Sequence, residues 1–262
     1  MQLRFGAATD TGRVRARNED RFVADGALGF FAVVDGMGGH AGGELASATI
    51  AEAVTAFIRE TAADSDKTWP VGLDARLSVL ANRLQVAIRS GNRTLARRVQ
   101  ADAALEGSGA TLAAALFDDN RLAVSNVGDC RAYLLRGGHL SQITRDHSVV
   151  AEQVAQGLID SEAARTHPLR HVVTRAVSGQ AGMAVDILEL EVKAGDRLVL
   201  CSDGIHGVLT DNEIAALVSA DGQPLDEVCR AVIDEANAHG GPDNATTVVV
   251  EMVEGDELQS LE

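Results

Sequence analysis

The chain has 262 residues, of which 46% are hydrophobic and 23% are charged, a composition typical of a soluble globular protein. Acidic residues outnumber basic ones by 38 to 23, so a net charge of −15 would repel nucleic acid and anionic lipid. The three cysteines form no C-x-x-C pair, and the sequence shows neither a signal peptide nor a membrane-spanning run. We therefore expect a cytoplasmic monomer with no nucleic-acid or membrane partner, folded as one domain over residues 1–254 with an acidic tail at 255–262.

Two long helices are predicted in the first half of the chain. Apolar residues recur at helical spacing over residues 44–63 and again over residues 73–99. Residues 64–72 contain a proline and a glycine between these stretches, which predicts a loop. We expect the two helices to pair antiparallel.

Short apolar runs bounded by turn residues predict strands at residues 30–34, 111–117, 122–127, 131–135, 197–201 and 246–253. Residues 118–120 and Gly137-Gly138 separate consecutive runs, where hairpins need residues that tolerate positive φ, so much of the sheet is predicted to be antiparallel. Shorter helices are predicted at residues 149–156, 211–219 and 225–239, the last ending at Gly240-Gly241.

Four aspartates stand where predicted strands begin or end: Asp35, Asp129, Asp203 and Asp243. Each has a glycine beside or near it, which lets the backbone turn sharply and approach an ion closely. Carboxylates gathered at one edge repel one another unless a cation neutralises them. Oxygen ligands favour Mg²⁺ or Mn²⁺, and the lack of paired His and Cys spacing argues against zinc. The alternative, that each Asp only forms a turn or a cap, suits a single position better than four.

Six motifs follow one another along the chain: RARNED at 15–20, DGMGGHAGGE at 35–44, GSGAT at 107–111, GDCR at 128–131, SDG at 202–204 and GGPDN at 240–244. In this order they resemble the bacterial metal-dependent serine/threonine protein phosphatases of the PPM, or type 2C, family. The resemblance runs from about residue 5 to residue 253. It implies an α+β fold, a central sandwich of two antiparallel β-sheets flanked by pairs of antiparallel helices.

The resemblance also implies an activity. Family members hydrolyse phosphoserine and phosphothreonine in proteins by direct attack of a water or hydroxide that bridges two metal ions. The partners would then be phosphoproteins, a bacterial Ser/Thr kinase and its targets among them. Two alternatives stay open: a metal-dependent phosphatase of a small phosphoester, and a catalytically silent module that binds phosphoproteins. The presence of Arg15 and all four aspartates argues against the silent module.

By resemblance, the cofactor would be two tightly bound Mn²⁺ or Mg²⁺ ions. Asp35 would bridge them, the backbone carbonyl of Gly36 would bind one, and Asp203 and Asp243 would complete the shell of the other. Asp20, together with Glu19, would hold metal-bound waters.

A third, weaker ion would lie between Asp129 and Asp203, by the same resemblance. The alternative for Asp129 is that it caps a turn and pairs with Arg131. A backbone ligand from the region of His171 would also fit the third position.

Arg15 resembles the arginine that clamps the phosphate, a task that suits the fork of a guanidinium. Its alternative is a solvated surface arginine. His40 resembles the proposed general acid of the family, but Met37, Gly38 and Gly39 separate it from the Asp-Gly pair, so a substrate-contacting or structural role is equally open. Residues 144–178 correspond to the family's flap, which lies beside the active site and shapes substrate choice.

Overall fold

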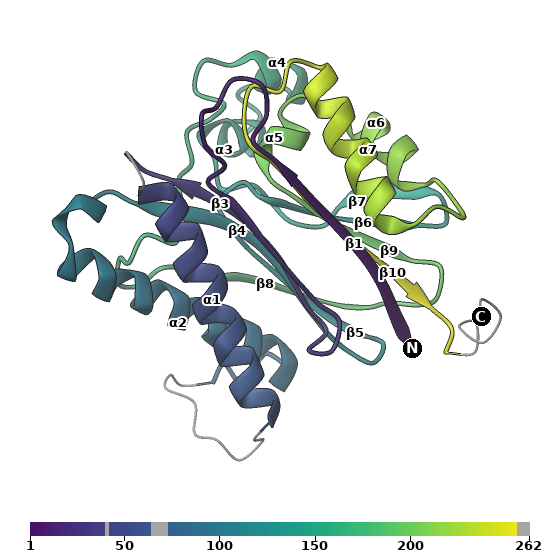
Figure 1. Ribbon diagram of the computed structural model, residues 1–262, viewed down its shortest axis with the longest axis horizontal. Coiled ribbons are helices and arrows are strands. Elements are labelled where there is room, and N and C mark those ends of the chain that lie inside the picture. The colour runs from purple at the N-terminus through teal and green to yellow at the C-terminus, as the bar shows by residue number, and fades with distance from the viewer. Residues whose placement is uncertain (40–41, 64–72, 256–262) are drawn as a thin grey trace.

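The computed structural model describes residues 1–39, 42–63 and 73–255. Two five-stranded sheets are stacked face to face, with helices on both outer faces (Figure 1). One sheet has the order β1 (Gln2–Asp10), β10 (Ala245–Val253), β9 (Arg197–Cys201), β6 (Arg131–Arg136), β7 (His139–Gln142). The other has the order β2 (Asp20–Asp25), β3 (Phe30–Met37), β4 (Gly109–Asp118), β5 (Arg121–Val127), β8 (Asp186–Glu191). Every pairing is antiparallel, so the predicted sandwich is confirmed.

Helices form the two outer layers. The long helices α1 (Gly42–Ala63) and α2 (Val79–Ala101) cover the β3–β4 side, and α6 (Asp211–Val218) and α7 (Leu225–Ala238) cover the β1–β10 side (Figure 1). A 3₁₀ turn, Ala103–Leu105, follows α2. The short helices α3 (Val149–Ala155), α4 (Ser161–Thr166) and α5 (Asp203–His206) lie at one end of the sandwich. None of the described helices is both long and apolar enough to cross a membrane.

Strand β3 shows how the sequence produces a strand that is buried on both faces. Its residues 30–34 are all apolar and almost fully buried, because both faces of the strand are covered. Phe30, Ala32 and Val34 face α1 and α2, whereas Phe31 and Val33 face the other sheet. This two-residue alternation fixes the register, since a slip by one position would exchange the two faces.

The predicted start of the second helix was wrong. Helix α2 begins at Val79 and not near residue 73, because the Ser78 side chain accepts a hydrogen bond from the amide of Ala81 at 3.1 Å and caps the helix there. The segment before it is a turn in which Asp74 binds both the backbone and the guanidinium of Arg76. The predicted loop at residues 64–72 and residues 256–262 of the predicted tail lie outside the described residues.

Candidate metal and phosphate site

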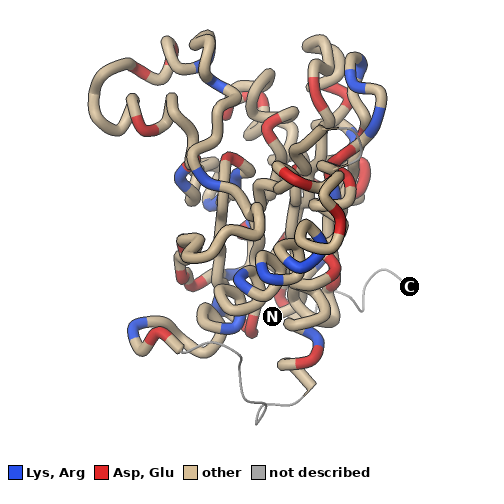
Figure 2. Tube along the Cα trace, turned by 90° about the vertical axis from the view of Figure 1, so that its left-hand side faces the viewer, with Lys and Arg blue, Asp and Glu red and all other residues tan. Residues whose placement is uncertain are grey.

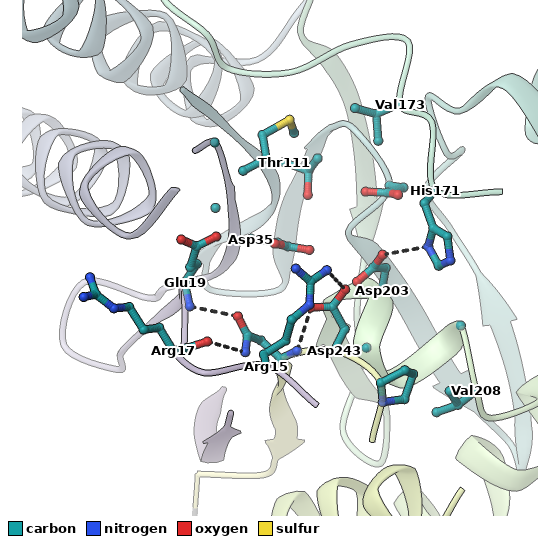
Figure 3. A pocket seen from close by; sticks show the side chains of 18 of the residues that line it. Arg15, Arg17, Glu19, Asp35, Thr111, His171, Val173, Asp203, Val208 and Asp243 are labelled. Atoms are coloured by element: carbon teal, nitrogen blue, oxygen red, sulfur yellow. Dashed lines mark hydrogen bonds and ion pairs between the residues drawn. The ribbon is translucent and has the colours of Figure 1, made fainter. Parts of the chain in front are cut away.

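A cleft of about 770 Å³ opens at the end of the sandwich that carries α5. Figure 3 shows side chains of both sheets converging there, with Arg15 beside the carboxylates of Asp203 and Asp243. The lining includes the following predicted residues: Arg15, Glu19, Asp35, Gly36, Asp129, His171, Asp203 and Asp243. The structure therefore brings together residues that are more than two hundred positions apart in the sequence.

Asp35 lies on the floor of the cleft, inside β3 and not at its end as the sequence suggested. It is paired in register with Asp20 at the start of β2 and with Thr111 on β4. Its pKa is raised well above the ordinary value by burial and then by the negative charges of Asp20 and Asp203. The floor of the cleft is therefore a site where carboxylates lie close enough to repel one another.

Asp20 links the two sheets. Its side chain is buried, and its Oδ2 accepts a hydrogen bond of 2.7 Å from the Ser202 hydroxyl. The same hydroxyl accepts one of 3.0 Å from the amide of Thr246 on β10. Burial, only partly opposed by hydrogen bonds from Thr246 and Ser202, raises the pKa of Asp20 to about 6. Its Oδ1 is buried and has no hydrogen-bond partner in the described structure.

Asp203 opens helix α5 directly after β9. Its Oδ1 is buried without a hydrogen-bond partner among the described residues, and its Oδ2 lies 3.8 Å from Nδ1 of His171. That distance is an ion-pair contact and is too long for a hydrogen bond. The Asp203 carboxylate raises the pKa of His171, and the nearby histidines hold the pKa of Asp203 below its ordinary value despite its burial.

Asp243 precedes β10 and pairs with Arg15, whose Nη2 donates a hydrogen bond of 2.7 Å to its Oδ2 (Figure 3). The Arg15 side chain is 55% exposed, so its guanidinium stands at the mouth of the cleft and not in the core. The pKa of Arg15 is raised by this bond and by the charges of Asp203 and Asp35. Arg15 is thus directed toward the carboxylates and is not an isolated surface arginine.

Glu19 and the buried Gly36 lie side by side in the wall of the cleft. The backbone amide of Glu19 donates a hydrogen bond of 2.8 Å to Oδ1 of Asn244. The amide group of Asn244 in turn donates to the carbonyls of Thr11 and Arg17, so one side chain joins the segment before β2 to β10. A Cβ on Gly36 would collide with the carbonyl of Gly43 and lie 2.7 Å from that of Glu19. Only glycine fits this crowded corner.

Asp129 follows β5 and is buried. Burial, followed by repulsion from Asp203 and Asp146, raises its pKa to about 7. Arg131 does not pair with it, because the Arg131 guanidinium binds Asp146 at 2.8 Å. The backbone carbonyl of Asp129 lies 2.9 Å from Nε2 of His206, which fixes the turn.

His147 is a supporting residue that the sequence analysis missed. Its Nδ1 accepts a hydrogen bond of 3.0 Å from the amide of Gly128, so Nε2, 3.1 Å from Asp186, carries the proton. Gly128 adopts a φ of +105° and packs against Thr111, which positions Asp129 next to it. The only local signal was the sequence Asp146-His147-Ser148 at the start of the flap. His40, in contrast, lies outside the described residues.

The donor set suits a hard divalent cation. It offers carboxylate and carbonyl oxygens, two of which are buried without a partner in the described structure. In the part of the chain that is described, no three His, Cys, Asp or Glu side chains are placed to hold one ion by themselves. Water and backbone oxygens would have to complete each shell, as is usual for Mg²⁺.

A family model described as protein phosphatase 2C matches residues 12–252. The chain belongs to the protein phosphatase 2C family. The serine/threonine protein phosphatase PstP of Mycobacterium tuberculosis is 40% identical over 98% of this chain, which spans 46% of PstP. The serine/threonine phosphatase stp of Listeria monocytogenes is 32% identical over 93% of both proteins.

A solved structure of another 2C-family member shares the fold. The catalytic domain of PstP in complex with two manganese ions superposes with a TM-score of 0.82 at 38% identity, covering 96% of this chain and 99% of that one. The layered sandwich is therefore the architecture of the family. The chain spans about half the length of full PstP and nearly all of the solved catalytic domain.

Proposed function

We propose that this chain hydrolyses phosphoserine and phosphothreonine in proteins, with a pair of divalent cations as cofactor. The observation that carries the proposal is the cluster of mutually repelling carboxylates at the cleft. Asp20, Asp35 and Asp129 all have raised pKa values, and Asp20 and Asp203 each have a buried oxygen without a partner in the described structure. Such a cluster is stable as a set of anions only when cations neutralise it.

Mn²⁺ or Mg²⁺ fits the oxygen donors, and the manganese ions in the PstP structure support this choice. In the proposed arrangement Asp35 bridges the two sites, with Gly36 contributing its carbonyl to one and Asp203 and Asp243 serving the other. Asp20 and Glu19 hold water in the outer shell. When bound, the cations supply an activated water at neutral pH and neutralise charge on the phosphoryl group.

The remaining steps fall to side chains of the cleft. Arg15 exchanges its contact with Asp243 for two phosphate oxygens and orients the phosphoryl group through its planar fork. His171 and Arg170 line the opposite side of the cleft and keep its charge from being wholly negative. Asp129, with Asp203, forms a third, weaker cation position at the flap side. The substrates are phosphoproteins, including a Ser/Thr kinase and its targets.

The experiment compares a phosphothreonine peptide with small metabolic phosphoesters at matched Mn²⁺ concentrations. We expect the peptide to be hydrolysed with the higher kcat/KM and chelation to abolish turnover. Asp243→Asn should lose activity, whereas Asp234→Asn, an exposed carboxylate on α7, serves as the control and should keep it. Undiminished turnover after exhaustive chelation would contradict the proposal.

A further inference from the structure

A second cavity lies beside the cleft, between helices α3 and α4 of the flap and the body of the protein. We call this cavity the flap groove. It has a volume of about 400 Å³ and shares Asp129, Arg170, His171 and Asp203 with the cleft, so the two cavities adjoin. The groove is therefore within reach of the residues that neighbour a phosphorylated residue bound in the cleft.

The walls of the groove combine apolar and basic groups with the carboxylates of Asp129, Asp146 and Asp203. Val150, Val154 and Ala164 supply the apolar surface, and Arg145, Arg165 and Arg170 supply the charge. The same flap also exposes large apolar side chains next in sequence to the lining residues Arg170 and His171: Leu169 is 44% exposed and Val172 is 43% exposed. These apolar groups favour a polypeptide over a small phosphoester as the bound molecule.

The three arginines have no carboxylate within ion-pair distance among the described residues. Arg165 has only a weak contact with the carbonyl of Leu209, at 3.4 Å. Of the three carboxylates that line the groove, Asp146 is bound by Arg131, and Asp129 and Asp203 are the ones assigned above to the proposed cation positions. What distinguishes Arg145, Arg165 and Arg170 is that all three line one groove beside the cleft, in a protein with a net charge of −15.

We propose that the flap groove binds the substrate chain beside the phosphorylated residue and selects an acidic side chain there through Arg145, Arg165 and Arg170. The inference rests on the proposed function, because it assigns the groove to the same substrate. The acidic surface elsewhere repels such a segment, and three unpaired guanidinium groups supply the local attraction that overcomes this repulsion. The substrates are thus phosphoproteins with Asp or Glu close to the phosphorylated position.

The test uses phosphothreonine peptides in which a single glutamate is moved through the positions on either side of the phosphothreonine. Each is compared with the peptide carrying glutamine at the same position. We expect the glutamate peptide to have a kcat/KM about threefold higher at one or two positions. Combined Arg145→Gln, Arg165→Gln and Arg170→Gln substitutions should bring this ratio to about one.

The matched control is Arg97→Gln. Arg97 is exposed on α2, has no ion pair among the described residues and lines neither cavity. Figure 2 views the face made by α1 and α2 and shows basic positions recurring along a helix there. Arg97→Gln removes the same charge and should leave the glutamate-to-glutamine ratio unchanged. A ratio that falls equally in this variant would contradict a specific groove.

A second measurement separates peptide binding in the groove from hydrolysis of the phosphate. Binding of the same peptide pairs made with a non-hydrolysable phosphonate is followed by fluorescence anisotropy, and the preference for glutamate should weaken as salt is raised. Equal affinity and equal kcat/KM at every position, or a preference that survives the triple substitution, overturns the role of the groove. Failure to hydrolyse any peptide overturns the proposed function instead, and the binding preference then still decides the groove.

Discussion

The two ends of strand β9 hold buried charge in opposite ways. At its start, Arg197 is nearly buried, and all five of its N–H donors are used. Their partners are Glu251, Asp221 and the carbonyls of Val218 and Ala220. Just past its other end, Asp203 joins a cluster of carboxylates with unpartnered oxygens. The hydrogen-bonding groups of Arg197 are all satisfied by the protein itself, as expected of a structural charge. Those of Asp203 are not, as expected of a carboxylate that binds a ligand.

The largest expected effect is at Asp203, just past the end of β9, where carboxylate oxygens have no partner in the described structure. Asp203→Asn should lower turnover of a phosphopeptide by at least about a thousandfold, roughly 4 kcal/mol of barrier, because a ligand of the proposed cation pair is lost. The metal-free variant should lose only a small part of its free energy of unfolding, because the charge of Asp203 repels Asp35 and Asp129 but is itself favoured by the nearby histidines. Activity assays and thermal unfolding with a chelator present measure the two effects. A metal-free variant that unfolds readily would show that Asp203 is structural.

Removing the counter-charge of Arg197, at the start of β9, should lower stability and leave activity unchanged. Glu251 faces both Arg4 and Arg197 across its neighbouring strands and accepts two hydrogen bonds from Arg197, at 2.7 and 2.9 Å. Glu251→Gln should lower the free energy of unfolding by about 3 kcal/mol, because the buried guanidinium loses its main counter-charge. Denaturant titration gives this value. The activity per folded molecule should remain that of wild type, and its loss would contradict the division between the two ends.

The next prediction concerns Arg15, at the mouth of the cleft near Asp203. Arg15→Ala should lower kcat/KM for a phosphopeptide by about ten- to a hundredfold, since a charged hydrogen bond to phosphate is worth about 1.5 to 3 kcal/mol. Arg15→Lys should recover only part of this, because lysine lacks the fork. Steady-state kinetics at saturating Mn²⁺ separate an increase in KM from a decrease in kcat. Unchanged kinetics would show that Arg15 is a surface arginine that does not bind the phosphate.

The smallest effect is expected at Asp129. Asp129→Ala should lower turnover by about tenfold, roughly 1.4 kcal/mol, while most of the stabilisation by metal is kept, because the tight pair of sites remains. Calorimetric titration of Mn²⁺ into wild type and variant counts the ions bound. Equal stoichiometry combined with equal turnover would eliminate the third site.

The strands that could be predicted from the sequence share one property. All six are interior strands of the two sheets, in which burial on both faces produces a continuous apolar run. The four that were missed, β1, β2, β7 and β8, are the edge strands of the described structure. Their burial patterns are mixed, because solvent reaches one side, so their apolar signal is diluted by polar residues.

The residues of the candidate site also fall into those that could be predicted from the sequence and those that could not. Asp129, Asp203 and Asp243 could be predicted because each stands beside an interior strand and a glycine. Ser202 and His147 could not, because their roles depend on partners brought close only by folding: Asp20 lies 182 residues from Ser202, and Gly128 lies 19 residues from His147. Short sequence patterns report burial and turns, but they carry no information about such distant partners.

The hydrogen bond from Ser202 to Asp20 also bears on how this fold can diverge. It crosses from one sheet to the other, and the carboxylates of the cleft come from segments attached to both. The chain passes between the sheets after β1, β5, β7 and β8, so each sheet is assembled from separate stretches of sequence. A single recombination crossover between two relatives cannot exchange one sheet as a unit. Divergence must therefore proceed by substitutions that preserve the fit between the sheets, or by changes in peripheral segments such as the flap.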